Sequence, residues 1–325
     1  MPDEFLRLDP QNQREVINAA SQQLDMVPAV VEKDVWVCYA LNVLYSIPNR
    51  RPMVFKGGTS LSKVFNLIKR FSEDIDISIN FLQDYKGVMS KTRAGNLRDE
   101  IEAKLQAYKA DVLLPVLEEQ TKQYELIVES GETDWELHIN YKSVLASVPT
   151  YIKTRVKIEL SGRNETEPSK KYTVRPYLLQ KTDDLVFPEA TIDALLAERT
   201  FWEKVTLIHA GLNSGSIEKT PERLSRHWSD VSVIMKTETG KRAIEDKELR
   251  LKVIKHKDAF WRDGKAKYDD CLNKKFNLVP TGNTLALLKR DYEIMLDSGM
   301  FFNERPASFD EVIEDIRKLE SHLNS

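Results

Sequence analysis

Two aspartates separated by a single residue, Asp74 and Asp76, are the residues whose types and spacing most clearly indicate chemistry. In a β-strand, residues two positions apart point to the same face, so these carboxylates project side by side while Ile75, Ile77 and Ile79 line the other face. Adjacent carboxylates repel each other unless a cation lies between them. Oxygen ligands of this kind suit Mg²⁺ or Mn²⁺, the ions that bind nucleotide phosphates. The alternative is a loop in which the acidic pair is merely solvated.

A pair of glycines, Gly57 and Gly58, precedes the acidic segment. Glycine has no Cβ atom, so a ligand can approach the backbone closely at this turn. Thr59 or Ser60 can cap a following helix, and a helix N-terminus beside a glycine turn attracts anions. The spacing fits neither a Walker A loop nor a dinucleotide-binding fingerprint. The expected helix carries its apolar residues at helical spacing: Leu61, Val64, Phe65 and Ile68.

A strand expected at 151–160 alternates apolar residues with charged ones. Its polar face ends in a carboxylate, Glu159, and a basic face of this kind suits a groove that holds phosphates. Glu159 is therefore a candidate third acidic group beside the two aspartates. A solvated strand face with alternating charges is the other explanation. The basic residues of the face are Lys153, Arg155 and Lys157.

The C-terminal half carries further charged residues at helical spacing. Lys204 lies between an apolar stripe and its polar flank, a position from which a lysine can reach a triphosphate, although periodicity alone makes it a surface lysine. Arg199 can pair with Glu203 at i+4 spacing. By the same spacing Asp230 can form a salt bridge with Arg226.

The segment 252–275 mixes lysines with Phe260, Trp261 and Tyr268. Cations beside aromatic rings can hold an unpaired RNA end through phosphate contacts and base stacking. The same aromatic residues could equally belong to the core of a helix.

The elements that must position these residues form a pattern typical of a mixed α+β fold. Periodicity predicts two helices within 11–47, the second beginning near Pro28, and a long helix at 96–117. We expect a mixed sheet lobe flanked by helices in residues 1–190 and a helical C-terminal lobe in residues 191–325. Strands are expected at 124–129, 135–141 and 151–160, an exposed loop at 161–171, a helix start at 220–222, and helices throughout from residue 192.

Length and composition narrow the class of protein. A chain of 325 residues can bury a large core and usually forms two lobes. The net charge of −3 argues against a protein that coats nucleic acid, and a local basic groove is compatible with it. Cys38 and Cys271 form no metal-binding pattern and suit a reducing cytoplasm. The N-terminus lacks the pattern of a signal peptide and the apolar stretch 35–47 is too short to span a bilayer, so we expect a cytoplasmic protein without membrane contact.

The chain resembles the polymerase-beta-like nucleotidyltransferase superfamily, and more closely the AbiEii-type abortive-infection toxins. The resemblance lies in Phe-Lys-Gly-Gly-Thr-Ser-Leu at 55–61 and in Arg-Phe-Ser-Glu-Asp-Ile-Asp at 70–76. It recurs along most of the chain, at 31–36, 199–204, 226–230 and 256–261. It implies that the sheet lobe is nucleotidyltransferase-like.

The resemblance also implies an activity. Such bacterial toxins transfer NMP from NTP to an RNA acceptor, in several members the 3′ end of tRNA, and are encoded beside a cognate antitoxin. By this resemblance Asp74 and Asp76 bind Mg²⁺ or Mn²⁺, Lys204 is a phosphate ligand, and Asp230 orients the nucleotide or the lysine. Glu159 would be the third carboxylate, although many relatives carry aspartate there. Nucleotide binding is assigned to Lys56, Gly57, Gly58, Thr59, Ser60, Ser72 and Arg199.

Two other functions remain open from the sequence. The same fold can serve a phosphotransferase or a small-molecule nucleotidyltransferase whose acceptor is a protein or a metabolite. It can also serve as a catalytically inactive module that assembles with a partner. The presence of Asp74, Asp76 and Lys204 argues against the inactive module.

Overall fold

The computed structural model describes residues 3–85, 91–149, 151–181, 185–261, 263–301 and 306–325. The described residues form two compact units. Unit 1 comprises Met1–Tyr85, Glu100–Leu195 and Ser298–Glu304, and unit 2 comprises Lys86–Asp99, Leu196–Asp297 and Arg305–Ser325. The predicted division into 1–190 and 191–325 stays a prediction, because a compact unit is not by itself an independently folding domain.

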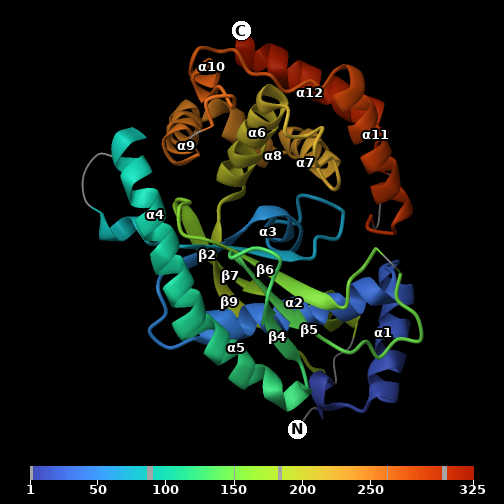
Figure 1. Ribbon diagram of the computed structural model, residues 1–325. Coiled ribbons are helices and arrows are strands. Elements are labelled where there is room, and N and C mark those ends of the chain that lie inside the picture. The colour runs from blue at the N-terminus through green and yellow to red at the C-terminus, as the bar shows by residue number, and fades with distance from the viewer. Residues whose placement is uncertain (1–2, 86–90, 150, 182–184, 262, 302–305) are drawn as a thin grey trace. The chain divides into compact units, whose positions relative to one another are not determined.

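Within the described residues, unit 1 contains a seven-stranded mixed sheet with the strand order β4-β5-β6-β3-β2-β9-β7 (Figure 1). β3 runs parallel to β6 and β2 parallel to β9, whereas the other neighbouring strands are antiparallel. The mixed α+β fold class is therefore confirmed. The strands are β2 (Met53–Lys56), β3 (Asp74–Ile79), β4 (Ile127–Ser130), β5 (Glu136–Asn140), β6 (Arg155–Ser161), β7 (Ser169–Val174) and β9 (Ala190–Leu195), and β1 (Asp3–Glu4) pairs separately with β8 (Leu185–Val186).

Alternation along β3 separates an apolar from a polar face, as predicted. The isoleucines of β3 are at most 1 % exposed, and their cross-strand neighbours include the buried Phe55 on β2 and Ile158 on β6. Asp74 and Asp76 point to the opposite face. The alternative of a solvated acidic loop is therefore wrong, because the segment is a strand at the centre of the sheet.

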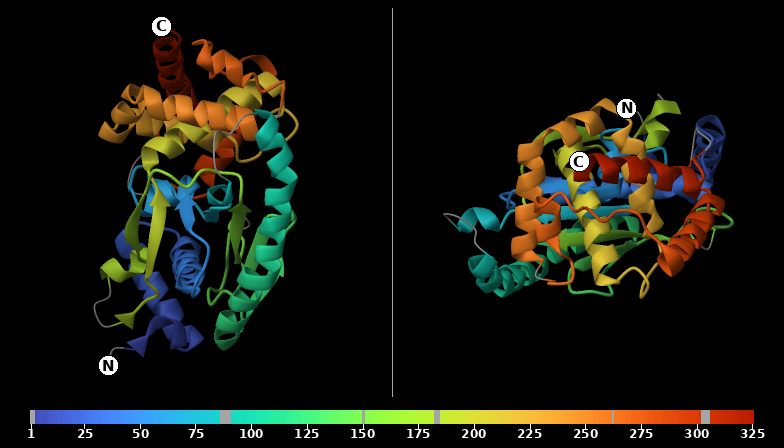
Figure 2. Two further views of the ribbon diagram at one scale, coloured as in Figure 1. Left: turned by 90° about the vertical axis from the view of Figure 1, so that its left-hand side faces the viewer. Right: turned by 90° about the horizontal axis from the view of Figure 1, so that it is seen from above.

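The two predicted N-terminal helices are confirmed as α1 (Pro10–Leu24) and α2 (Pro28–Ser46). Proline is favoured in the first turn of a helix, where its missing N–H costs no hydrogen bond, and both helices begin with one. α2 packs against β6 and β9 on one face of the sheet (Figure 2), and most of its residues are buried. Its buried residues include three consecutive charged ones, Glu32, Lys33 and Asp34.

Helix α3 (Gly57–Lys63) is shorter than the sequence predicts and does not reach Ile68. Asn66 has a φ of 52°, a left-handed conformation in which a helix cannot continue. The helix begins directly at the glycine turn, so Thr59 and Ser60 lie inside it. The prediction that one of them caps the helix is therefore wrong.

The long helix predicted at 96–117 begins earlier and is interrupted. α4 (Lys91–Tyr108) leads through a π-helical turn (Lys109–Leu113) into α5 (Leu114–Thr121). Pro115 explains the widened turn, because its ring clashes with the carbonyl four residues earlier and it has no N–H to donate.

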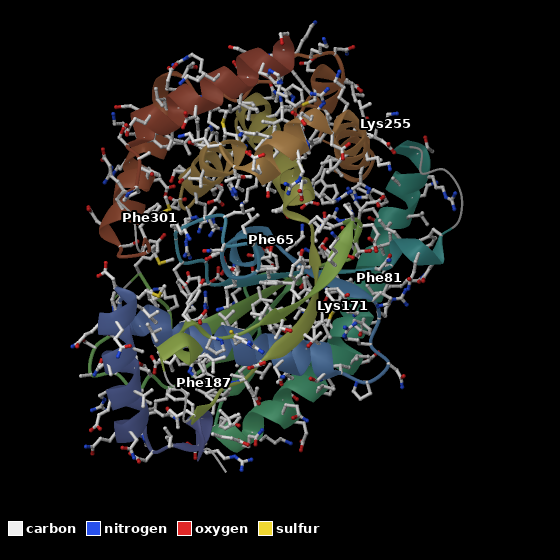
Figure 3. The ribbon with its side chains drawn as sticks, turned by 180° about the vertical axis from the view of Figure 1, so that it is seen from behind. Phe65, Phe81, Lys171, Phe187, Lys255 and Phe301 are labelled. Atoms are coloured by element: carbon white, nitrogen blue, oxygen red, sulfur yellow. The ribbon has the colours of Figure 1, made fainter. Side chains whose placement is uncertain are left out.

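Several predicted strand limits need correction. β4 and β5 correspond to the strands expected at 124–129 and 135–141, but β6 begins only at Arg155 rather than at 151. The loop expected at 161–171 includes the start of β7, and Ile192 belongs to β9 rather than to a helix. β7 exists because it pairs with β9, a long-range contact that local composition does not show. Lys171 of this edge strand, labelled in Figure 3, forms an ion pair with Asp193 of β9 at 3.0 Å.

Unit 2 is helical around α6 (Ala197–Ser214), which contacts each of the helices from α7 to α10. Trp202 and Trp228 fill its core, and their Nε1 atoms donate to the carbonyls of Ala243 and Leu278 at 2.8 and 2.9 Å. The other helices are α7 (Ser225–Met235), α8 (Glu238–Glu245), α9 (Lys247–Phe260), α10 (Tyr268–Leu272), α11 (Gly282–Asp297) and α12 (Phe309–Asn324).

The helix predicted to start at 220–222 begins at Ser225 as α7. Asp291 of α11 supplies the cap, because its carboxylate accepts hydrogen bonds from the backbone N–H of Arg223 at 2.6 Å and of Ser225 at 2.9 Å. A cap donated by a residue far along the chain leaves no local signal in the sequence.

Over the part of the chain that the structure describes, no helix is long and apolar enough to cross a membrane.

Candidate active site

The polar face of the sheet in unit 1 carries charged residues in two cross-strand rows. Adjacent strands lie about 4.8 Å apart, so residues in register on neighbouring strands have adjacent side chains. The first row consists of Lys56 on β2, Asp76 on β3, Glu159 on β6 and Glu136 on β5. The second consists of Asp74 on β3, Lys157 on β6, His138 on β5 and Glu129 on β4. The fold thus brings together four of the predicted site residues, namely Lys56, Asp74, Asp76 and Glu159.

The glycine turn lies directly against the acidic strand. Gly57 has a φ of +79°, and a Cβ atom at this position would lie 1.9 Å from Oδ2 of Asp76. A Cβ atom on Gly58 would lie 2.8 Å from Oγ of Ser72 and 3.1 Å from Nη2 of Arg70. The sequence predicted that the glycines make room for a ligand. In the structure they make room for the protein's own side chains, and so join the turn to the acidic strand.

The hydroxyls of Thr59 and Ser60 are used within the fold. Thr59 Oγ1 donates to the carbonyl of Asp74 at 2.5 Å, and Ser60 Oγ donates to the carbonyl of Gly57 at 3.0 Å. Both residues are 0 % exposed. Thr59 thereby fixes helix α3 to the first residue of β3.

Arg70 is absent from the predicted site residues, yet it is buried next to the turn at 4 % exposure. Its Nη1 donates to the carbonyl of Phe71 at 3.2 Å, and this hydrogen bond holds the guanidinium against the segment that leads to Asp74. The sequence could have pointed to Arg70 as a site residue, because Arg70 begins the motif at 70–76, four residues before the first aspartate.

Lys157 lies among carboxylates on the same face. Its Nζ donates to Glu159 and lies 4.0 Å from Oε1 of Glu136. Burial disfavours the ammonium form, but attraction to Asp74, Glu159 and Glu136 outweighs burial and raises the pKa of Lys157. The acidic face therefore already contains a cation, and the predicted third carboxylate is bound to a lysine of its own strand.

Unit 2 holds a second cluster of predicted residues, on α6 and α7. Lys204 Nζ lies 3.0 Å from Oδ2 of Asp230 and 3.4 Å from Nδ1 of His227. Lys204 is 7 % exposed and Asp230 is 1 % exposed, so the surface-lysine alternative is wrong. Arg199 forms the predicted i+4 contact with Glu203, with 3.6 Å between Nε and Oε1.

The aromatic residues of the segment 252–275 divide between two environments. Phe260 and Tyr268 are buried in unit 2, at 2 % and 7 % exposure, so the core alternative is correct for both. Lys257 Nζ lies 3.9 Å from the ring centroid of Trp261 in a cation–π contact. RNA binding by this segment stays a prediction.

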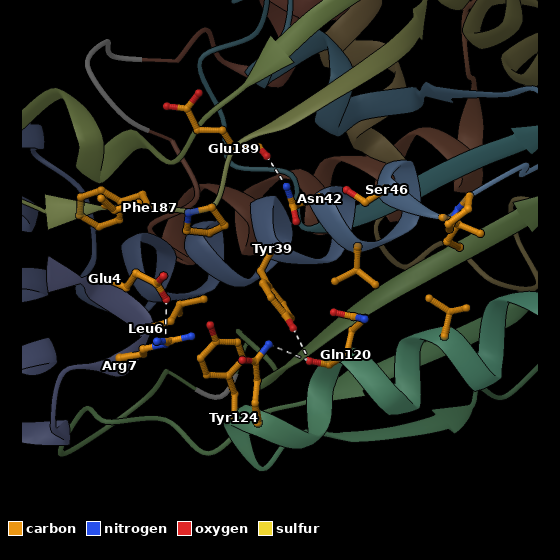
Figure 4. A pocket seen from close by; sticks show the side chains of 17 residues that line it. Glu4, Leu6, Arg7, Tyr39, Asn42, Ser46, Gln120, Tyr124, Phe187 and Glu189 are labelled. Atoms are coloured by element: carbon orange, nitrogen blue, oxygen red, sulfur yellow. Dashed lines mark hydrogen bonds and ion pairs between the residues drawn. The ribbon is translucent and has the colours of Figure 1, made fainter. Parts of the chain in front are cut away.

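A cavity of about 570 Å³ lies elsewhere in unit 1, and its lining includes none of the predicted site residues (Figure 4). Tyr39 and Tyr124 form part of its wall, with their rings edge to face at 5.2 Å. Arg7 of the lining is paired with Glu4 at 2.9 Å. A surface arginine that is already paired attracts a triphosphate only weakly, so the acidic face is the better candidate for the active site.

The donor atoms of the acidic face fit a divalent ion that completes its coordination with phosphate oxygens. Among the described residues, no group of three or more His, Cys, Asp or Glu side chains is arranged to hold a metal ion. Mg²⁺ does not need such a group, because it is commonly bound by one or two carboxylates together with waters and substrate phosphates. Asp74 and Asp76 supply two carboxylates on one face of β3.

Comparison with known proteins gives the family. Residues 41–315 match the model of the AbiEii family, described as nucleotidyl transferase AbiEii toxin of type IV toxin–antitoxin systems. Since this match covers most of the chain, the protein belongs to the AbiEii nucleotidyltransferase toxin family. Among solved structures it is similar to MenT4, a nucleotidyltransferase toxin from Mycobacterium tuberculosis, with 16 % identity, a TM-score of 0.49, and coverage of 95 % of this chain and 89 % of that one. No curated protein matched the chain.

Membership in this family confirms the resemblance found in the sequence. It supports nucleotidyl transfer as the reaction class, with an NTP as substrate and an antitoxin as partner. Toxins of this class generally use a divalent metal, and the two aspartates of β3 are suited to one.

Proposed function

We propose that this toxin transfers NMP from an NTP to the 3′ end of an RNA in a reaction that depends on Mg²⁺ or Mn²⁺. The proposed acceptor is tRNA, and the proposed place of action is the cytoplasm, where blocked tRNA would stop translation and growth. The observation that carries the proposal is the contact of the Gly57 turn with Asp76. This contact brings a glycine turn of the kind that binds phosphate next to two carboxylates of the kind that bind a metal ion.

Asp74 and Asp76 are the proposed metal ligands. The bound ion would neutralise phosphate charge and lower the pKa of the acceptor hydroxyl. Ser72 and Arg70, which lie against Gly58, supply a hydroxyl and a guanidinium for phosphate oxygens. Lys56, in register with Asp76, adds a cation beside the same carboxylates. The acceptor hydroxyl then attacks the α-phosphorus and pyrophosphate leaves, a displacement that depends mainly on positioning and on charge neutralisation.

Four further residues have proposed roles. Lys204 is the proposed phosphate ligand, and Asp230 orients its ammonium through their 3.0 Å contact. Arg199, on the same helix, is a proposed nucleotide-binding residue. Glu159, in register with Asp76, is the proposed third carboxylate that helps to activate the acceptor hydroxyl.

The test is NMP transfer by the Asp76→Ala variant, incubated with total tRNA and each α-labelled NTP in turn. We expect transfer to fall by at least about 100-fold, because the variant lacks one carboxylate that stabilises the transferring phosphate through its metal. Its growth inhibition should disappear and its fold should persist in circular dichroism. Asp84→Ala is the matched control, because Asp84 pairs with Arg51 at 2.7 Å outside the two rows of the polar face. Labelled RNA from Asp76→Ala at the wild-type rate would contradict the mechanism.

Three related measurements separate the alternatives. Transfer of label from γ-labelled but not from α-labelled NTP would indicate a phosphotransferase. Label in a protein or metabolite, with none in RNA, would indicate another acceptor. Failure of the wild-type protein to bind NTP in the presence of Mg²⁺ would indicate an inactive module.

A further inference from the structure

We infer that the buried ion pair between Lys33 and Glu73 positions the acidic strand for metal binding, an inference that rests on the proposed function. Lys33 lies on α2, and Glu73 is the residue immediately before Asp74. Their Nζ and Oε2 atoms are 2.5 Å apart, and the two side chains are 2 % and 4 % exposed. A lysine far away in the sequence therefore holds the start of the strand that carries both proposed metal ligands.

Lys33 also holds the neighbouring strand. Its Nζ donates to the carbonyl of Lys153 at 2.9 Å, two residues before β6 begins. β3 and β6 are parallel neighbours, so their first residues lie at the same end of the sheet. One ammonium thus ties the starts of the two strands together, and this tie favours the register in which Asp76 lies beside Glu159.

The next residue of α2 holds the end of helix α3, the helix that begins at the glycine turn. Asp34 pairs with Lys63, the last residue of α3, and accepts a hydrogen bond from the backbone N–H of Tyr177 at 2.7 Å. Lys63 Nζ lies 3.9 Å from the ring centroid of Tyr177. Consecutive residues of α2 therefore hold the two segments whose contact forms the proposed site.

Glu32 has a different role, although it is equally buried. Its carboxylate accepts hydrogen bonds from Ser143 Oγ at 2.6 Å and from the backbone N–H of Val144 at 2.7 Å. These residues lie in a loop after β5 rather than in the glycine turn or the acidic segment. Glu32 is therefore a matched control for the loss of one buried charge on the same helix.

Stability alone does not explain the Lys33–Glu73 pair. Desolvation of two buried charges offsets much of their attraction, and apolar residues of similar volume often replace such a pair without loss of stability. Residues that orient metal ligands, in contrast, commonly change metal affinity or activity by about 10- to 100-fold when they are replaced. The two explanations, stabilisation of the fold and orientation of the metal ligands, therefore predict different metal affinities for a variant in which both charges are removed.

The experiment compares wild-type protein with the Lys33→Met/Glu73→Gln double variant, which removes both charges and leaves neither buried alone. Mn²⁺ binding is measured by electron paramagnetic resonance, with and without a non-hydrolysable NTP analogue, and NMP transfer is measured as a function of Mg²⁺ concentration. We expect a folded protein whose Mn²⁺ dissociation constant and half-saturating Mg²⁺ concentration both rise about 10- to 100-fold. The KM for the acceptor RNA should not change. Glu32→Gln should bind Mn²⁺ as the wild type does.

Wild-type Mn²⁺ affinity in the double variant would overturn the inference and leave the proposed function intact. An equal loss of affinity in Glu32→Gln would also overturn it, because the effect would then belong to any buried charge of α2. If the double variant does not fold, Glu73→Asp is measured instead, because it keeps both charges and shortens the contact with Lys33 by one methylene, with the same expected direction and the same contradiction. If the wild type neither binds Mn²⁺ nor transfers NMP, the proposed function fails and the inference fails with it.

Discussion

At the scale of single residues, the proposed site depends on close contact between backbone and side chain. Asp76 Oδ2 occupies the space where any other residue at position 57 would place its Cβ atom. The positive φ of Gly57 is the second reason for glycine, because L-residues rarely adopt it. The sequence suggested that this glycine makes room for a ligand, whereas the contact that requires glycine in the structure is with the Asp76 carboxylate.

Gly57→Ala tests this contact. The left-handed backbone should cost about 1–2 kcal/mol of unfolding free energy. The new Cβ atom should also displace the Asp76 carboxylate, and NMP transfer should fall at least about 10-fold, as replacements next to a metal ligand do. Gly215→Ala is the matched control, because Gly215 has a φ of +68° and nothing lies within 4 Å of its Cβ position. Similar destabilisation by both substitutions, with NMP transfer lost only in Gly57→Ala, is the expected result from urea unfolding and the α-label assay. Equal transfer in the two variants would contradict it.

At the scale of elements, the helices and strands that the sequence predicted correctly are those that a local pattern of residues encodes. The alternation of β3 and the periodicity of α1 and α2 follow from residues a few positions apart, and these elements are confirmed. β7 is a strand only through its pairing with β9, and the α7 cap comes from Asp291, so neither could be predicted locally. The register of β3 with β6 decides which charged side chains are neighbours, and it could not be predicted from the local sequence either. It shows that Lys157 lies beside Asp74.

Lys157→Met tests the charge balance of this strand pair. Without the ammonium, the carboxylates of Asp74, Glu159 and Glu136 repel each other, so the melting temperature of the metal-free variant should fall. Added Mg²⁺ should then raise it by about 2–4 °C more than in the wild type, which corresponds to about 1 kcal/mol. Lys170→Met, on the edge strand β7, should respond to Mg²⁺ as the wild type does. An identical Mg²⁺ response in Lys157→Met and wild type, measured by differential scanning fluorimetry, would exclude this charge balance.

At the scale of the whole molecule, each unit contains a histidine that is kept neutral in the interior. In unit 1, burial and then the nearby Arg155 cation lower the pKa of His138. In unit 2, burial lowers the pKa of His209. This effect outweighs the hydrogen bond to the carbonyl of Lys267, which raises the pKa. His209 Nδ1 accepts the backbone N–H of Asn277 at 3.0 Å, and Nε2 lies 3.0 Å from the Lys267 carbonyl, a pairing that fits the neutral ring with Nε2 protonated.

Acid should therefore destabilise the protein well above the range in which carboxylates titrate. Below the reference histidine pKa of about 6.5 the unfolded chain binds a proton that native His209 does not, so stability is fully present above this pH and is lost as the pH falls. Each such histidine contributes a slope of at most about 1.4 kcal/mol per pH unit. In urea titrations between about pH 7.5 and 5.5, His209→Gln should reduce this slope, because an amide also offers one acceptor and one donor but does not titrate. If His209→Gln and wild type lose stability equally over this range, His209 is not the group that takes up the proton.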